Sequence, residues 1–174
     1  MVISRRKFIK GLVAGATFFS FGNVFASTNT ERTLSMHNVH TGERVNMTYC
    51  SSGKYDAEAL GRINHLLRCH YTNEVKEMDV NLLDLLCQIK NSVDKNKEIQ
   101  IISGYRSATY NEYLINHGRN VSRNSLHLKG IAIDFAIEGM GNNKLSEIAK
   151  SFAVGGVGKY PEFVHIDVGR VRYW

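Results

Sequence analysis

The segment SLHLKGIAIDF, residues 125–135, places a histidine, a glycine and an aspartate within one short stretch, at His127, Gly130 and Asp134. From Ile131 onward the stretch is typical of a strand that is partly apolar on both faces. An ionised carboxylate in such a strand is costly to bury unless it is paired or bound to a metal. A bend at Gly130 would let His127 and Asp134 reach one ion.

A second segment, EFVHIDVG at residues 162–169, supplies a third candidate ligand, His165. Two imidazoles and one carboxylate are the ligand set of a catalytic zinc, in which the fourth position is left for water. Taken singly, His127 is also compatible with a loop histidine bonded to backbone, and His165 with a core histidine in a strand. Together with Asp134 they favour a zinc site of the open, catalytic kind.

The first 26 residues have the features of an export signal and are set apart from the fold. Residues 4–10, SRRKFIK, form a twin-arginine pattern, and residues 24–26, VFA, have the form of a cleavage site. A membrane anchor is the alternative, but the uncharged stretch of residues 11–25 is shorter than the roughly 20 residues that a spanning helix needs. We therefore expect cleavage near Ala26, export to the periplasm by the twin-arginine route, and no stable membrane span afterwards.

The basic charge of the whole chain resides largely in that signal. The chain has 22 lysines and arginines and 16 aspartates and glutamates, for a net charge of +6. Four basic residues and no acidic ones lie in residues 1–26, so the remainder has 18 basic and 16 acidic residues, a net charge of +2. No run of lysine and arginine is left, and composition gives no support to nucleic-acid binding.

Residues 27–174 have the length of one domain with a single core. The cysteines at positions 50, 69 and 87 lack the spacing of a metal site, and one pair could be bridged in an oxidising compartment. Buried free thiols are the favoured interpretation, because twin-arginine cargo folds before it crosses the membrane and does not need disulfides to reach its fold.

Hydrophobic periodicity predicts a hairpin followed by helices and strands. The hairpin joins residues 32–36 to 44–49, helices are predicted over 56–71, 79–93, 108–117 and 145–152, and strands over 99–102, 131–137 and 163–168. This order indicates an α+β domain in which helices pack on one side of a small, mostly antiparallel sheet.

Three motifs together resemble the zinc D-Ala-D-Ala peptidases of the LAS group, which includes the VanX-type dipeptidases and shares its fold with the hedgehog signalling domain. The motifs are Ser103-Gly-Tyr-Arg106-Ser, Ser125-x-His127-x6-Asp134 and His165-x-Asp167. Within that group the chain resembles the murein endopeptidase K (YcbK-like) family, which combines a twin-arginine signal with this domain. The resemblance covers most of residues 30–174.

The resemblance implies a zinc-dependent murein endopeptidase that hydrolyses peptide cross-links between peptidoglycan stem peptides in cell-wall remodelling. It implies that His127, Asp134 and His165 bind the zinc ion. Arg106 corresponds to the arginine that steadies the substrate oxygen as negative charge develops. Ser125 lies where the family uses a hydroxyl to hold the peptide.

Two carboxylates are candidates for the general base. VanX-type enzymes carry it in a Glu-x-x-His pattern, which here falls on Glu162 and His165. Asp167 is the rival, because residues two apart in a strand point to the same face, so Asp167 and His165 share the metal side. Asp167 could accept the proton or orient His165. We favour Glu162, which must reach in from the loop before the strand.

Two other functions stay open at this point. A non-catalytic zinc domain that binds cell-wall peptide or a partner protein would bind zinc without turnover, although a closed structural site normally fills the fourth position with another side chain. A D,D-carboxypeptidase or dipeptidase would require a cleft closed at one end. Both D,D and L,D cross-links are candidate substrates of an endopeptidase, and the oligomeric state is open.

Overall fold

The computed structural model describes residues 31–174, so the predicted signal and its cleavage site at residues 1–26 lie outside the described residues. In chain order the elements are β1 (Arg32–Asn38), β2 (Arg44–Ser51), β3 (Lys54–Tyr55), α1 (Ala57–Leu66), α2 (Val80–Val93), β4 (Ile99–Ser103), α3 (Ala108–Asn116), the 3-10 helix η1 (Leu126–Lys129), β5 (Ala132–Ile137), α4 (Asn142–Ser151), β6 (Gly156–Lys159), β7 (Val164–Asp167) and β8 (Arg172–Tyr173).

The strands form one mixed sheet in the order β3-β2-β1-β4-β5-β7-β6-β8. Two neighbouring pairs, β1 with β4 and β6 with β8, are parallel. The other pairs are antiparallel. The predicted α+β domain with a mostly antiparallel sheet is confirmed.

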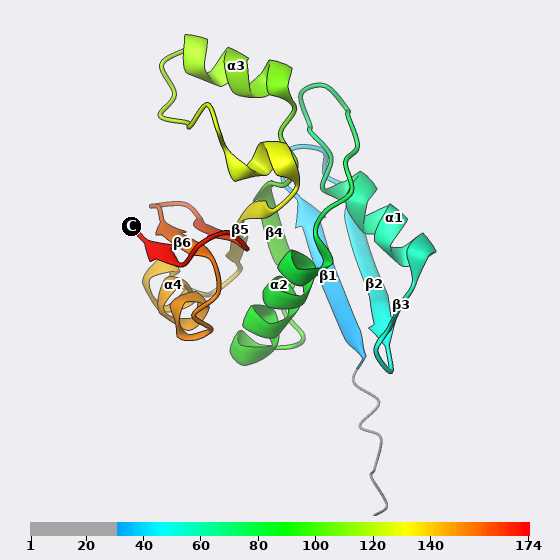
Figure 1. Cartoon of the computed structure of the whole chain (residues 1–174). Coiled ribbons are helices and arrows are strands. Elements are labelled where there is room, and N and C mark those ends of the chain that lie inside the picture. Colours follow the sequence, from blue (N-terminus) through cyan, green and yellow to red (C-terminus); the bar gives the residue numbers. More distant parts are fainter. Residues whose placement is uncertain (1–30) are drawn as a thin grey trace, which may run out of the picture.

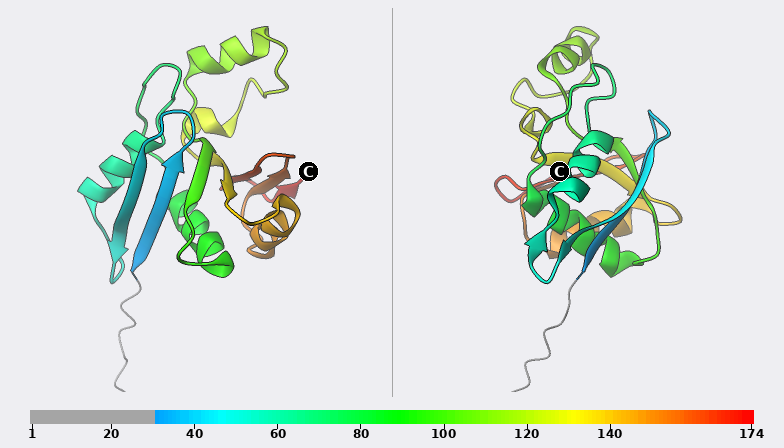
Figure 2. Two further views of the ribbon diagram at one scale, coloured as in Figure 1. Left: turned by 180° about the vertical axis from the view of Figure 1, so that it is seen from behind. Right: turned by 90° about the vertical axis from the view of Figure 1, so that its right-hand side faces the viewer.

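One face of the sheet carries the hydrophobic core. Ile133 and Phe135 of β5 and Val164 and Ile166 of β7 are fully buried there together with the apolar faces of α1, α2 and α4. These three helices lie along the sheet, whereas α3 and η1 lie beyond one end of it (Figures 1 and 2). Because side chains alternate along a strand, the residues between the core positions, Asp134 and His165 among them, point to the opposite face.

Two of the differences between the predicted and the observed elements have tertiary causes. Helix α1 ends at Leu66, five residues before the predicted end at Tyr71, because the Leu67 carbonyl accepts a hydrogen bond from the Tyr105 amide (2.8 Å). Strand β6 was not predicted, since its glycines weaken the strand pattern. Pairing with β7 and β8 forms it nonetheless.

The three cysteines are free and buried, as predicted. Within residues 31–174, no helix combines the length and the apolar character that crossing a bilayer requires.

Gly130 turns the chain between η1 and β5, as its place between His127 and Asp134 predicts. It has a left-handed backbone (φ +72°), and a Cβ there would lie 2.6 Å from the Glu77 carbonyl oxygen. The Gly130 carbonyl also accepts a hydrogen bond from the amide of Asp79, the N-cap of α2 (3.0 Å). The glycine thus lets η1 sit directly on the segment that leads into α2.

We expect Gly130→Ala to lower the free energy of unfolding by about 2–3 kcal/mol, because it adds a steric clash to the cost of a left-handed alanine. Gly118→Ala is the matched control: Gly118 has nearly the same φ (+71°), and nothing lies within 4 Å of its added Cβ. That control should lose about 1–2 kcal/mol. Urea unfolding of both variants measures the difference, and equal losses would show that the close approach to Glu77 does not constrain the turn.

Candidate metal centre

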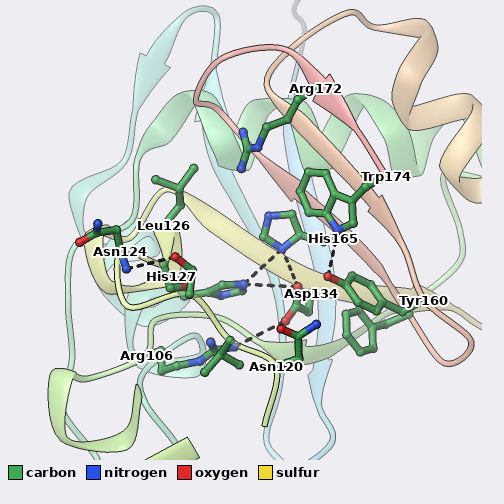
Figure 3. A pocket seen from close by; sticks show the side chains of 14 residues that line it. Arg106, Asn120, Asn124, Leu126, His127, Asp134, Tyr160, His165, Arg172 and Trp174 are labelled. Carbon is green, nitrogen blue, oxygen red and sulfur yellow. Dashed lines mark hydrogen bonds and ion pairs between the residues drawn. The ribbon is translucent and has the colours of Figure 1, made fainter. Parts of the chain in front are cut away.

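Three elements bring the predicted ligands together. Asp134 of β5 and His165 of β7 are directly opposed across the antiparallel pair, and His127 reaches them from η1. Asp134 Oδ1 lies 2.8 Å from His165 Nδ1 and 3.3 Å from His127 Nε2. The two imidazole nitrogens lie 3.3 Å apart. All three side chains are buried, and they converge on one point (Figure 3).

The hydrogen bonds behind the two imidazoles set their tautomers. His127 Nδ1 lies 2.8 Å from the Gly104 carbonyl oxygen, which can only accept, so this nitrogen carries the proton. His165 Nε2 lies 3.1 Å from Asp167 Oδ2 and donates to it in the same way. His127 Nε2 and His165 Nδ1 are therefore the ring nitrogens that face Asp134. Because the Asp134 carboxylate can only accept, the 2.8 Å bond places a proton on His165 Nδ1 as well, and a metal ion would take the place of that proton. Metal-binding histidines are held by such partners on the other ring nitrogen.

The ligands also shift each other's pKa. Burial by itself would raise the pKa of Asp134, but the neighbouring imidazoles of His127 and His165 outweigh it and hold the pKa well below its usual range. For His165, burial lowers the pKa, while the carboxylates of Asp134 and Asp167 outweigh this effect and raise it. A metal ion that binds here must displace a proton, so affinity falls at low pH.

Asp167 lies on the same face of β7 as His165, as strand periodicity predicts, but both oxygens of its carboxylate already accept hydrogen bonds. Oδ1 accepts from the amides of Gly156 (3.0 Å) and Gly169 (2.8 Å) and from Arg172 Nη1 (3.1 Å). Oδ2 accepts from Arg172 Nη2 (2.7 Å) and His165 Nε2 (3.1 Å). Burial alone would raise the pKa of Asp167, yet these donors keep it well below the usual range. A carboxylate so occupied is a poor proton acceptor.

A cavity of about 400 Å³ opens beside the ligands. Arg106 lines it, with Nη2 3.8 Å from Asp134 Oδ2 and Nη1 3.4 Å from Asn111 Oδ1, while its Nε has no hydrogen-bond partner. Burial lowers the pKa of Arg106, and the charge of Asp134 partly compensates. Ser125 lines the same cavity, and its hydroxyl does not cap η1. The structure therefore brings Arg106 and Ser125 to the ligands, as predicted.

The structure does not bring Glu162 to this site. The Tyr160 amide bonds to the Phe163 carbonyl (3.0 Å), which closes a tight turn with Pro161 and Glu162 at its exposed tip. Phe163 and Tyr160 line the cavity instead, and Glu162 is not among the lining residues. Glu162 does not reach in from this loop as expected, because the turn directs its side chain into solvent.

Tyr160, Arg172 and Trp174 are among the cavity residues to which the sequence analysis assigned no role. Trp174 Nε1 donates to the Tyr160 hydroxyl (2.9 Å), and the Trp174 ring lies 5.3 Å from the His165 ring. The Arg172 guanidinium stacks 5.0 Å over the Trp174 ring while it holds Asp167. The pairing of β8 with β6 brings the end of the chain back beside His165.

Comparison with known proteins identifies the family. A family model described as peptidoglycan L,D-endopeptidase MepK matches residues 26–174. The peptidoglycan L,D-endopeptidase MepK of Escherichia coli (strain K12) is 39% identical over 150 residues, which cover 85% of this chain and 82% of that protein. The probable peptidoglycan L,D-endopeptidase MepK of Haemophilus influenzae is 39% identical over 151 residues, covering 85% and 81%. The predicted relationship is confirmed: the chain belongs to the peptidoglycan L,D-endopeptidase MepK family.

Proposed function

We propose that the protein is a zinc-dependent murein endopeptidase that hydrolyses L,D peptide cross-links of peptidoglycan in the periplasm. The observation that carries the proposal is the convergence of three candidate ligand atoms at the wall of a cavity, with one nitrogen of each imidazole turned toward Asp134. The names of the relatives supply the bond class. The twin-arginine pattern in residues 4–10 supports the compartment.

The donor set fits zinc. Two neutral imidazoles and one carboxylate leave a fourth position open toward the cavity, as in catalytic rather than structural zinc sites. When bound, zinc lowers the pKa of a water molecule to about 7 and polarises the carbonyl of the scissile amide. An open position beside a cavity also argues against a purely structural, non-catalytic metal domain.

The chain's own residues would then hold and orient the peptide. The Arg106 guanidinium, buried and only loosely paired at 3.8 Å with Asp134, can bond the carbonyl oxygen of the substrate as negative charge develops on it. The Ser125 hydroxyl can hold the peptide backbone beside the ligands. The names of the relatives are those of endopeptidases, which favours a bond within a cross-link over the free end that a carboxypeptidase recognises.

We infer that Asp167, rather than Glu162, is the carboxylate that contributes to this site, and that its role is to orient the His165 ring. Its bond to His165 Nε2 keeps that ring turned so that Nδ1 faces the other ligands. Both of its oxygens are occupied by donors, which leaves no lone pair for a proton in transit.

The test is product analysis on defined substrates. The purified protein, loaded with zinc, is incubated with two muropeptide dimers that differ only in having an L,D or a D,D cross-link, and with murein sacculi. Mass spectrometry should show the L,D dimer converted to monomers, conversion lost after chelation and restored by zinc. Cleavage of the D,D dimer alone would overturn the bond assignment. Zinc binding without cleavage of either dimer or of sacculi would overturn the enzyme assignment.

A further inference from the structure

The wall of the cavity on the side away from His127 and Arg106 is aromatic (Figure 3). Tyr160 and Trp174 line the cavity there, and Phe163 also lines the cavity. The Tyr160 and Phe163 rings stack with centroids 4.6 Å apart and planes inclined by 23°. The Tyr160 hydroxyl is a polar group on this aromatic wall that could bond a molecule in the cavity.

The direction of one hydrogen bond decides where the proton of that hydroxyl points. An indole N–H can only donate, so the 2.9 Å bond from Trp174 Nε1 makes the Tyr160 oxygen the acceptor. No group in the described part of the chain accepts the hydroxyl proton in return. The hydroxyl points toward Asp134 and His165 in the cavity (Figure 3), so its free proton is available to a molecule bound beside the ligands.

The surroundings hold this pair in place before any substrate binds. The Trp174 backbone is bonded twice to β6, with its amide donating to the Val157 carbonyl (3.2 Å) and its carbonyl accepting from the Lys159 amide (3.0 Å). Its ring lies flat against Gly158, where a Cβ would meet ring atoms at 2.5 Å. The Tyr160 carbonyl accepts from Asn142 Nδ2 (3.3 Å) at the start of α4. Fixed donors stabilise developing charge best, because they need no reorganisation during the reaction.

We propose that the Tyr160 hydroxyl donates a hydrogen bond to the scissile carbonyl oxygen of the bound peptide as that oxygen becomes negative, and that Trp174 positions the hydroxyl for this task. The inference rests on the proposed endopeptidase function and adds a second donor to Arg106. The two donors approach from different sides of the ligand cluster. Tyr160 is in this sense a catalytic residue, whereas Trp174 is a positioning residue that acts through it.

Tyr160→Phe isolates the hydroxyl, because phenylalanine keeps the ring that stacks on Phe163. We expect kcat on the L,D dimer to fall about tenfold, with KM nearly unchanged, since the bond strengthens only as charge develops. Tyr173→Phe is the matched control. Tyr173 is a neighbouring exposed tyrosine whose hydroxyl donates to the Lys150 carbonyl (3.4 Å), and it does not line the cavity. The Tyr173→Phe variant should keep kcat and KM at wild-type values.

A double-mutant cycle tests the role given to Trp174. Trp174→Phe removes the indole donor and keeps an aromatic ring over Gly158, and we expect kcat to fall about threefold to tenfold. In the Tyr160→Phe background the same change should have almost no further effect, because the hydroxyl that it orients is absent. Independent, multiplying losses would show that Trp174 does not act through Tyr160.

Two further readouts separate this inference from its alternatives. The dissociation constant for zinc should be the same in wild type, Tyr160→Phe and Tyr173→Phe. A phosphinate analogue of the cross-link, which presents negative oxygens, should bind Tyr160→Phe about tenfold more weakly. Wild-type cleavage of the L,D dimer together with unchanged kcat and unchanged phosphinate affinity in Tyr160→Phe would overturn the role of Tyr160. An inactive wild-type enzyme would instead contradict the proposed function.

Discussion

Replacing His127 by alanine is expected to lower the rate of cross-link cleavage by at least about 10³-fold. The change removes one of three ligand atoms and leaves Asp134 and His165 to hold the ion alone. Bound zinc contributes several kcal/mol to stabilising charge in the transition state. A loss of about 4 kcal/mol corresponds to a factor of about 10³ in rate. Initial rates on the L,D-linked dimer and the zinc content of the purified variant measure both consequences.

His65→Ala is the matched control for this variant. His65 lies on α1 with 61% of its side chain exposed, and its nearest charged partner is Glu43 at 3.9 Å. It should retain wild-type rates and zinc content. If His127→Ala kept zinc and more than about a tenth of the wild-type rate, the ion would be held by another set of residues and the proposed site would be wrong.

Asp167→Asn is expected to weaken zinc binding and to lower the cleavage rate by about 10². The amide keeps the shape of the carboxylate, but it loses the charge that Arg172 and His165 Nε2 bond to. The His165 ring is then free to turn its Nδ1 away from the other ligands. Zinc titration with a competing chelator is the direct measurement, since a carboxylate that acted only as a proton acceptor would leave zinc affinity unchanged.

Glu162→Gln provides the comparison that separates the two carboxylates. Glu162 is exposed at the tip of a turn and does not line the cavity, so we expect its rate to change by less than about threefold. General acid–base catalysis contributes about 10²–10⁴ in rate, so the loss of a true base would be conspicuous. A drop of that size in Glu162→Gln, with zinc affinity intact, would restore the sequence-based prediction and show that the turn closes over the cavity during catalysis.

The candidate metal ligands could be proposed from the sequence because Asp134 and the bend before it have a local signature, and the two histidines complete the set. Asp134 is a carboxylate in an otherwise apolar strand, and burial requires a partner for it. Gly130 marks the bend that returns His127 to Asp134. The alternation of residues in β7 also places Asp167 on the same face as His165, as the structure bears out.

The sequence could not predict in the same way which of Glu162 and Asp167 lies beside the candidate ligands. A Glu-x-x-His spacing says nothing about the direction of the turn that carries the glutamate. The bond from the Tyr160 amide to the Phe163 carbonyl turns Glu162 outward. The bonds from Arg172 and from two backbone amides commit Asp167 to its place behind His165. The placement of each carboxylate depends on tertiary contacts that cannot be predicted from residue type or spacing.

The sequence by itself predicted the α+β class and the three candidate metal ligands, because strand alternation, a glycine bend and the pairing rule for buried charge are local and physical. Its motifs also resemble the family that the comparisons confirm. Only the tertiary structure decided which ring nitrogens face Asp134 and which groups form the cavity wall. The Gly104 carbonyl and Asp167 set the tautomers of His127 and His165 from behind. The pairing of β8 with β6 returns Trp174 to Tyr160 beside the same ligands, through strand contacts made only when the sheet is complete.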